Sequence, residues 1–277
     1  MGILSVENTT DTFDPTNGEC VLDGKAIGKS TELNPTFEKL LDAVALCNLS
    51  TVYSNLEESS EKKAASSWTA MGEPTDIALQ VLAMRFERGK TDILADESVT
   101  FVAEHPFNSA IKRMSVAYED TRMNTIDVFV KGAGESVLPL INSSEIQKQI
   151  IVERMTELAK QGLRVLCIAT KSLSSDSKGS VTNREWTESN LDFLGLVGLY
   201  DPPRLETAAS IRACRNAGIS CHMLTGDHID TATAIATEIG LLNNLSATTI
   251  NSKSVIMQGS QFDALSDAEI DALEQMP

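Results

Sequence analysis

The sequence predicts an α/β protein in which helices flank an antiparallel sheet and a parallel α/β segment follows. Apolar and polar residues alternate over residues 111–118 and 126–130, which is typical of neighbouring antiparallel strands. After residue 200 the order becomes helix, apolar strand, polar loop and helix, which indicates a parallel sheet. The 277 residues, 42% of them hydrophobic, are enough to bury one large core or two smaller ones.

The composition excludes several classes of protein. A formal net charge of −16 argues against a nucleic-acid partner, because no basic stripe is present to neutralise a phosphate backbone. The five cysteines are odd in number and lack C-x-x-C spacing, so they indicate reduced thiols of a cytosolic protein and no metal site. No apolar run reaches the length of a membrane span and no signal peptide is evident, so we expect a soluble chain without direct membrane contact.

The first elements are irregular strands and loops over residues 2–29, followed by a helix over residues 36–49. Asn34 and Pro35 supply a cap and a first-turn proline, and apolar residues then recur at helical spacing. The charged, serine-rich residues 56–67 indicate an exposed loop.

The next helix covers residues 77–86, with Pro74 in its first turn. Asp76 lies in the same turn, where the helix dipole favours a carboxylate.

The stretch from residue 105 to residue 135 holds the strongest functional signal. Phe107 is a flat aromatic that can stack on a base, Lys112 and Lys131 are cations that can meet phosphates, and Gly132 leaves the main chain open to close approach. Taken singly, each has a structural explanation: a core aromatic, solvated lysines and a strand-to-helix turn. Their combination is more specific and favours a nucleotide site.

A capped helix over residues 144–160 and a strand over residues 164–171 come next. Arg164 opens that strand, and its position alone equally fits a surface ion pair or a phosphate clamp. Residues 172–190 are rich in Ser, Asp and Lys and predict a loop.

A nearly continuous apolar strand over residues 191–200 ends at Asp201-Pro202-Pro203-Arg204, where two prolines stop the strand and stiffen its exit. This is the predicted hinge between domains at 1–200 and 201–277.

Beyond the hinge, the pattern predicts a helix over 205–217, a strand over 219–224, a helix over 230–239 capped by Asp230, and a short strand and helix over 259–277. Thr225, Gly226 and Asp227 follow the predicted strand, at the end where parallel sheets bind ligands.

Five ordered matches make the chain resemble the P-type cation ATPases, and most closely the fungal sodium-exporting pumps, with endoplasmic-type calcium pumps next. The matching segments are Gly72-Glu-Pro-Thr-Asp-Ile-Ala78, Phe107-Asn-Ser-Ala-Ile-Lys-Arg-Met-Ser-Val116, Val130-Lys-Gly-Ala-Gly-Glu135, Asp201-Pro-Pro-Arg204 and Met223-Leu-Thr-Gly-Asp227. The resemblance implies a nucleotide-binding domain at 1–200 and part of a haloacid-dehalogenase-like phosphorylation domain at 201–277.

The resemblance also implies roles for individual residues in binding ATP. Phe107 would stack on adenine, and Asp76, shorter than the Glu typical of the family, would reach its amino group through water or lose the contact. The cations Lys112, Lys131 and Arg164 would hold the phosphates. Gly132, Thr225, Gly226 and Asp227 would complete the nucleotide-binding set.

The family's Asp-Lys-Thr-Gly-Thr motif and its later Gly-Asp-Gly loop do not occur in this sequence. The resemblance therefore implies an internal fragment that has no catalytic or metal-binding residue of its own and does not turn over. In the parent pump, ATP and Mg²⁺ would serve phosphoryl transfer to the missing aspartate. The partners would be the transmembrane, actuator and remaining phosphorylation domains, on the cytosolic face of the plasma membrane.

Three alternatives differ in function. A calcium-transporting pump of the endoplasmic type shares the motifs, so sodium or potassium export rests on resemblance alone. A haloacid-dehalogenase-type phosphatase with a cap domain accounts for Thr225-Gly226-Asp227 but requires an Asp-x-Asp nucleophile that the sequence lacks. A non-catalytic module that binds a protein partner on the sheet leaves the ordered matches unexplained.

Overall fold

The computed structural model describes residues 2–29, 31–54, 68–242 and 256–271. The chain divides into two compact units, the first made of residues 1–148 and 166–197 and the second of residues 149–165 and 198–277. None of the described helices combines the length and hydrophobicity that a membrane span requires. The loop predicted at 56–67 lies outside the described residues.

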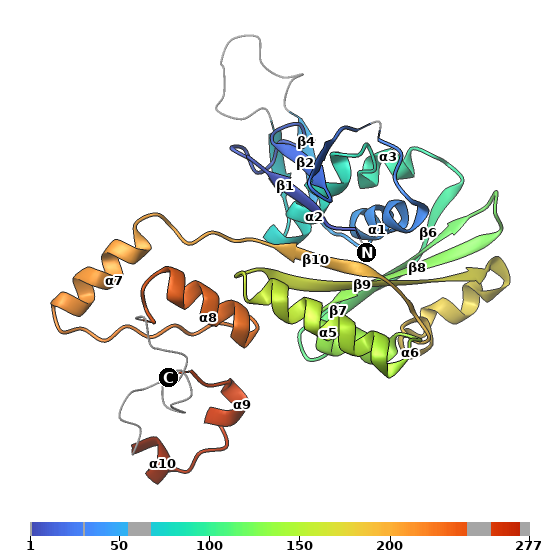
Figure 1. The fold of residues 1–277 in the computed structure, drawn as a ribbon. Helices are drawn as coiled ribbons and strands as arrows, with labels where there is room; N and C mark the ends of the chain where they lie inside the picture. The colour runs from blue at the N-terminus through green and yellow to red at the C-terminus, as the bar shows by residue number, and fades with distance from the viewer. Residues whose placement is uncertain (1, 30, 55–67, 243–255, 272–277) are drawn as a thin grey trace. The chain divides into compact units, whose positions relative to one another are not determined.

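A five-stranded sheet forms the centre of the first unit, with strand order β10-β9-β8-β7-β6 (Figure 1). The neighbours from β6 to β9 pair antiparallel, which confirms the antiparallel sheet predicted from alternation. The strands are β6 (Val99–Asn108), β7 (Arg113–Asp120), β8 (Thr125–Gly132), β9 (Arg164–Ser174) and β10 (Asp192–Leu199).

The start of β7 differs from the sequence prediction. Met114, Val116 and Tyr118 share one face of the strand and are buried, as the alternation predicts. Lys112 does not share it, because its φ of 46° places it in the turn between β6 and β7. A left-handed backbone cannot continue a strand, so β7 begins one residue later.

Helices α1 (Pro35–Leu46) and α2 (Pro74–Met84) contribute to the core on the Met114 face of the sheet. Both predicted helices are confirmed, and Asn34 Oδ1 caps α1 by accepting a 2.8 Å hydrogen bond from the amide of Phe37. The thiol of Cys47, directly after α1, donates to the carbonyl of Met114. This contact brings the end of α1 against β7.

The opposite face is covered by a segment that the sequence predicted to be a loop. Residues 172–190 instead complete β9 and form the 3₁₀ helix η2 (Ser175–Thr182) and the short helix α6 (Arg184–Thr187). The loop prediction was wrong because few apolar residues mark the segment, although Val181, Thr187 and Glu188 are buried.

Two smaller sheets and several short helices complete the first unit. The N-terminal residues form an ordered antiparallel sheet of β1 (Leu4–Glu7), β2 (Glu19–Leu22) and β3 (Lys25–Ile27). A second pair joins β4 (Thr51–Ser54) to β5 (Trp68–Met71). The short helices are α3 (Lys90–Leu94), α4 (Gly134–Val137) and η1 (Leu138–Leu140).

The second unit is helical in its described part. It holds most of α5 (Glu145–Ala159), together with α7 (Thr207–Asn216), α8 (Ile229–Glu238), α9 (Gly259–Phe262) and α10 (Asp267–Asp271). The helices predicted for α5, α7 and α8 are confirmed, and Ser144 and Gln147 form the predicted capping pair of α5.

Three local predictions in this unit fail. The strand predicted over residues 219–224 is not formed, and Leu224 is 93% exposed. A strand needs at least one neighbouring strand to pair with, and no described residue after Leu199 belongs to a strand. His228 rather than Asp230 caps α8, and residues 259–262 form helix α9 instead of a strand.

Candidate functional site

A bulge in β6 sets the position of Phe107. His105 pairs with Ser115 and Asn108 with Arg113, so Pro106 and Phe107 together stand opposite the single residue Met114. Met114 in turn pairs with Lys131 on β8. Phe107 and Lys131 therefore stand at the same level of the sheet, two strands apart, with backbones about 10 Å from each other. The Phe107 ring is 60% exposed.

Lys131 is buried and forms an ion pair with Asp76. Asp76 lies in the first turn of α2, and its second carboxylate oxygen accepts a 3.0 Å hydrogen bond from the amide of Leu49. The carbonyl of Asp76 accepts another bond, of 2.7 Å, from the side-chain amide of Asn48. The structure thus brings together two of the predicted site residues, and the contact joins β8 to α2.

Lys112 presents an exposed ammonium close to the same end of the sheet. Its carbonyl accepts a 3.0 Å hydrogen bond from the amide of Ala133, directly after β8. Its ammonium forms a 3.0 Å ion pair with Glu135, and both side chains are 55% exposed. An exposed pair of this kind is weak, so a phosphate can displace the carboxylate.

Close packing leaves no room for a side chain at Gly132. A Cβ at this position would lie 2.6 Å from the Lys112 carbonyl oxygen and 2.6 Å from Arg113 Cβ. The close neighbour is therefore the start of β7. Glycine here allows β8 to end against the turn that carries Lys112.

Buried and partly buried groups lie near the Lys131–Asp76 pair, and the sequence did not single them out as site residues. The ammonium of Lys90 donates to the Asn48 carbonyl at 2.8 Å, and desolvation lowers the pKa of Lys90. Desolvation also raises the pKa of the Cys47 thiol to about 12, although the positive charge of Lys131 opposes this. The sequence indicated Cys47 as part of the apolar stripe of α1, whereas no sequence pattern indicated that Lys90 would lie near the site.

The remaining predicted site residues belong to the second unit. Arg164 donates from Nε and Nη2 to the same oxygen of Asp227, at 3.1 and 2.6 Å. The hydroxyl of Thr225 accepts a 3.1 Å hydrogen bond from the amide of Asp227, and the space around Gly226 is open. Arg164 and Asp227, both predicted as nucleotide contacts, are thus paired with each other.

The predicted hinge residues Asp201, Pro202, Pro203 and Arg204 have no regular secondary structure and connect β10 to α7. Arg204 ends the connection, since its carbonyl accepts a 3.0 Å hydrogen bond from Thr207, the first residue of α7.

Within the described part of the chain, no group of three or more His, Cys, Asp or Glu side chains is arranged to hold a metal ion.

Residues 36–206 match the family model described as P-type ATPase, cytoplasmic domain N. The sodium/potassium exporting P-type ATPase cta3 of Schizosaccharomyces pombe is 42% identical over 296 residues, which cover 99% of this chain and 27% of that protein. Sodium/potassium exporting P-type ATPase 1 of Saccharomyces cerevisiae is 31% identical over 349 residues, covering 100% of this chain and 31% of that protein.

A calcium pump is similar as well. The endoplasmic reticulum calcium ATPase srcA of Aspergillus fumigatus is 28% identical over 303 residues, covering 96% of this chain and 29% of that protein. The chain spans about three tenths of the length of these relatives.

Proposed function

This chain belongs to the P-type cation ATPases, and on that premise we propose that it is the part of such a pump that binds ATP. The observation that carries the proposal is the β6 bulge, which brings the exposed ring of Phe107 level with Lys131 and beside the turn that holds Lys112. An aromatic face and two cations at one end of a rigid sheet suit a base joined to a phosphate chain.

The adenine ring stacks on Phe107, since that ring already faces solvent and no rearrangement is needed to reach it. The phosphates meet Lys112, which exchanges its exposed partner Glu135 for a group of higher charge. Lys131 contributes a positive charge that Asp76 holds in place. Asp76 itself reaches the adenine amino group through water, because both of its carboxylate oxygens are engaged by the protein.

Arg164, Thr225, Gly226 and Asp227 complete the nucleotide site in the parent pump. For Arg164 to clamp phosphate oxygens it must exchange its bonds to Asp227, and its side chain is 50% exposed and so accessible to an anion. Asp201 to Arg204 serve as the hinge about which residues 1–200, the nucleotide-binding domain, move relative to residues 201–277, the partial phosphorylation domain.

In the parent protein, the γ-phosphoryl group of ATP passes to an aspartate outside this chain, with Mg²⁺ neutralising its charge. The released energy drives export of sodium or potassium, which the names of the two yeast relatives support. Calcium transport is the alternative, supported by the calcium pump that also matches. This chain lies on the cytosolic face of the membrane, beside the transmembrane, actuator and remaining phosphorylation domains, and does not hydrolyse ATP alone.

Calorimetric titration of the 277-residue chain with ATP tests the site. Phe107→Ala removes the stacking surface and should weaken binding about 5- to 150-fold, the effect of about 1–3 kcal/mol. The matched control is Phe101→Ala, because Phe101 is also on β6 and is 56% exposed. Its affinity for ATP should equal that of the unmodified chain.

Lys112→Ala should weaken ATP binding as well, with Lys178→Ala as its control. The two lysines are alike, since each is more than half exposed and bonded to one glutamate, but Lys178 pairs with Glu119 near the other end of β7. If the double variant Phe107→Ala/Lys112→Ala binds ATP as tightly as the unmodified chain, the assigned site is wrong.

A further inference from the structure

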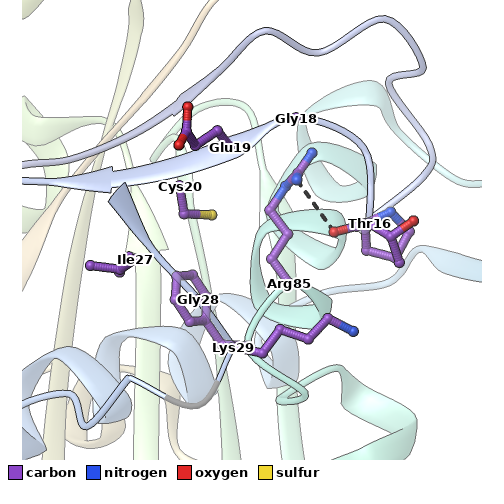
Figure 2. Close-up of a pocket in the computed structure, with 10 residues that line it drawn as sticks. Thr16, Gly18, Glu19, Cys20, Ile27, Gly28, Lys29 and Arg85 are labelled. Atoms are coloured by element: carbon purple, nitrogen blue, oxygen red, sulfur yellow. Dashed lines mark hydrogen bonds between the residues drawn. The ribbon is translucent and has the colours of Figure 1, made fainter. Parts of the chain in front are cut away.

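A cavity of about 230 Å³ lies between the N-terminal sheet and the end of α2 (Figure 2). Its walls include residues of β2 and β3, the segment that leads into β2, and the two residues that follow α2. The residues that line the cavity include Cys20, Ile27, Gly28, Lys29, Arg85 and Phe86.

Arg85 is buried in this wall with little to satisfy its charge. The residue is 6% exposed, and its Nη1 donates a 3.3 Å hydrogen bond to the carbonyl of Pro15. No carboxylate of the described residues lies within ion-pair distance of it. A guanidinium has five N–H donors, and burying it unpaired is costly. Among the described residues, Arg85 therefore has no counter-ion, although its burial makes one especially stabilising.

Arg88, in the same region, has the carboxylate partner that Arg85 does not have among the described residues. Three residues further on, its Nε and Nη2 donate to the two carboxylate oxygens of Asp42, each at 2.8 Å. Arg88 is also less buried than Arg85. The more buried of the two arginines is thus the one without a carboxylate.

The acidic groups near the cavity do not neutralise Arg85. Asp14 acts on Arg85 electrostatically but is not within ion-pair distance of it, and its carboxylate accepts bonds from the amide and hydroxyl of Thr16, at 2.7 and 2.6 Å. Figure 2 shows the Glu19 carboxylate directed away from the guanidinium. Desolvation raises the pKa of the Cys20 thiol, so this group is uncharged at neutral pH.

A second cation stands at the cavity. Lys29 lines it and forms a long ion pair of 3.7 Å with Glu87, and both side chains are at least half exposed. The wall near Ile27 and Phe86 is apolar. The cavity thus combines the buried N–H donors of the Arg85 guanidinium, the exposed ammonium of Lys29 and an apolar surface.

We propose that this cavity binds a small oxyanion, a phosphate or carboxylate group, held by the Arg85 guanidinium with Lys29 closing over it. Two oxygens of such a group match the planar donors of arginine, and the group supplies the counter-ion that the described residues do not. The ligand is a small metabolite with one such group and a compact body that packs against Ile27 and Phe86. The site is separate from the proposed nucleotide site, although α2 carries Asp76 in its first turn and ends immediately before Arg85.

Thermal unfolding of the 277-residue chain in rising inorganic phosphate, and separately in rising succinate, tests this proposal at constant ionic strength set by chloride. A ligand that binds the folded state alone raises the melting temperature as its concentration rises. We expect such a rise with phosphate or succinate, and the anion with the larger effect identifies the preferred head group. Arg85→Gln should abolish the rise, and Arg88→Gln should leave it unchanged. An equal rise in the unmodified chain and Arg85→Gln would overturn the proposal.

Two further measurements remain decisive if Arg85→Gln does not fold. Lys29 is half exposed, so Lys29→Gln keeps the fold and should weaken anion binding several-fold. The NMR signal of the Arg85 Nε–H should shift on adding phosphate or succinate to the unmodified chain, and a signal that stays constant in both overturns the proposal.

The variant Phe107→Ala/Lys112→Ala separates this site from the nucleotide site. Its response to inorganic phosphate should match that of the unmodified chain, even though its affinity for ATP is reduced. Loss of the phosphate response in this variant, together with its retention in Arg85→Gln, would place the anion on the nucleotide site and overturn the proposal.

Discussion

Lys131 and Asp76 form a buried ion pair that ties the central sheet to the first turn of α2. Both residues are buried, and Cys47 and Lys90 lie near enough to interact with them electrostatically. Its charges are compensated within the protein, so its first role is to fix α2 against β8.

Removing Lys131 alone should be strongly destabilising. Lys131→Met leaves the Asp76 carboxylate buried without its partner, which costs about 3–5 kcal/mol. The double variant Asp76→Asn/Lys131→Met should lose less than the sum of the two single variants, with a coupling of about 0.5–3 kcal/mol. Urea unfolding of the four proteins measures this cycle. Strict additivity would show that the two groups do not stabilise each other.

Gly132→Ala should destabilise the end of β8. The added Cβ would lie 2.6 Å from the Lys112 carbonyl oxygen and 2.6 Å from Arg113 Cβ. Overpacking of this kind costs about 1–3 kcal/mol. Gly179→Ala is the matched control, since nothing lies within 4 Å of its Cβ position and the substitution should change stability by less than about 0.5 kcal/mol. Equal unfolding midpoints for the two variants would contradict the packing explanation.

Glu188 should be among the most sensitive polar positions of the first unit. Its 1% exposed side chain accepts hydrogen bonds from Arg113 at 2.6 Å, Ser115 at 2.9 Å and Arg184 at 3.0 Å. Glu188→Ala leaves two guanidinium groups without this carboxylate and should cost about 3–5 kcal/mol. Glu185→Ala, at an exposed position of α6, the helix that ends directly before Glu188, should have little effect on the urea midpoint. A small loss for Glu188→Ala would mean that solvent replaces the carboxylate.

Stability should fall at alkaline pH because buried groups keep their protons in the folded state. Desolvation raises the pKa of Cys47 and Cys167 from 9.0, and that of Tyr118 from 10.0, to about 12 in each case. The unfolded chain releases these protons first, so stability is complete below pH 9 and declines as pH rises toward 12. Urea unfolding across that range measures the slope.

Substitution of one buried thiol should reduce that alkaline slope. Cys167→Ala removes one proton that the folded state retains, whereas Cys214→Ala, in a partly exposed position of the second unit, serves as the control. A slope unchanged by Cys167→Ala would contradict the assignment of this thiol as a group that is buried and protonated.

The parts of the fold that the sequence predicted well carry strong local signals. Asn34 and Pro35 began α1 as expected, and the apolar alternation of β7 and β8 gave the correct antiparallel pairing. The covering segment η2–α6 was missed because polar interactions hold it, chiefly those of Glu188 with Arg184, four residues earlier, and with Arg113, which is distant in sequence. Residues 219–224 have the apolar composition of a buried strand. A segment of this composition forms a strand only where a neighbouring strand is present to pair with it.

The candidate site was predictable in residue type and only partly in geometry. Periodicity placed Lys112 on β7, whereas its left-handed backbone places it in the turn. The sequence also indicated Lys131 and Asp76 separately, with no signal that they would meet. Pairings between distant segments depend on three-dimensional packing, which local patterns do not encode.

Pro106 and Phe107 together stand opposite the single residue Met114 in the β6 bulge. The direction of the Phe107 ring therefore depends on the number of residues in this bulge. Deleting one residue between His105 and Asn108 would restore regular pairing and alter which side of the sheet the ring faces. Chain length at this point therefore determines which side of the sheet carries the aromatic side chain, independently of which amino acids surround it.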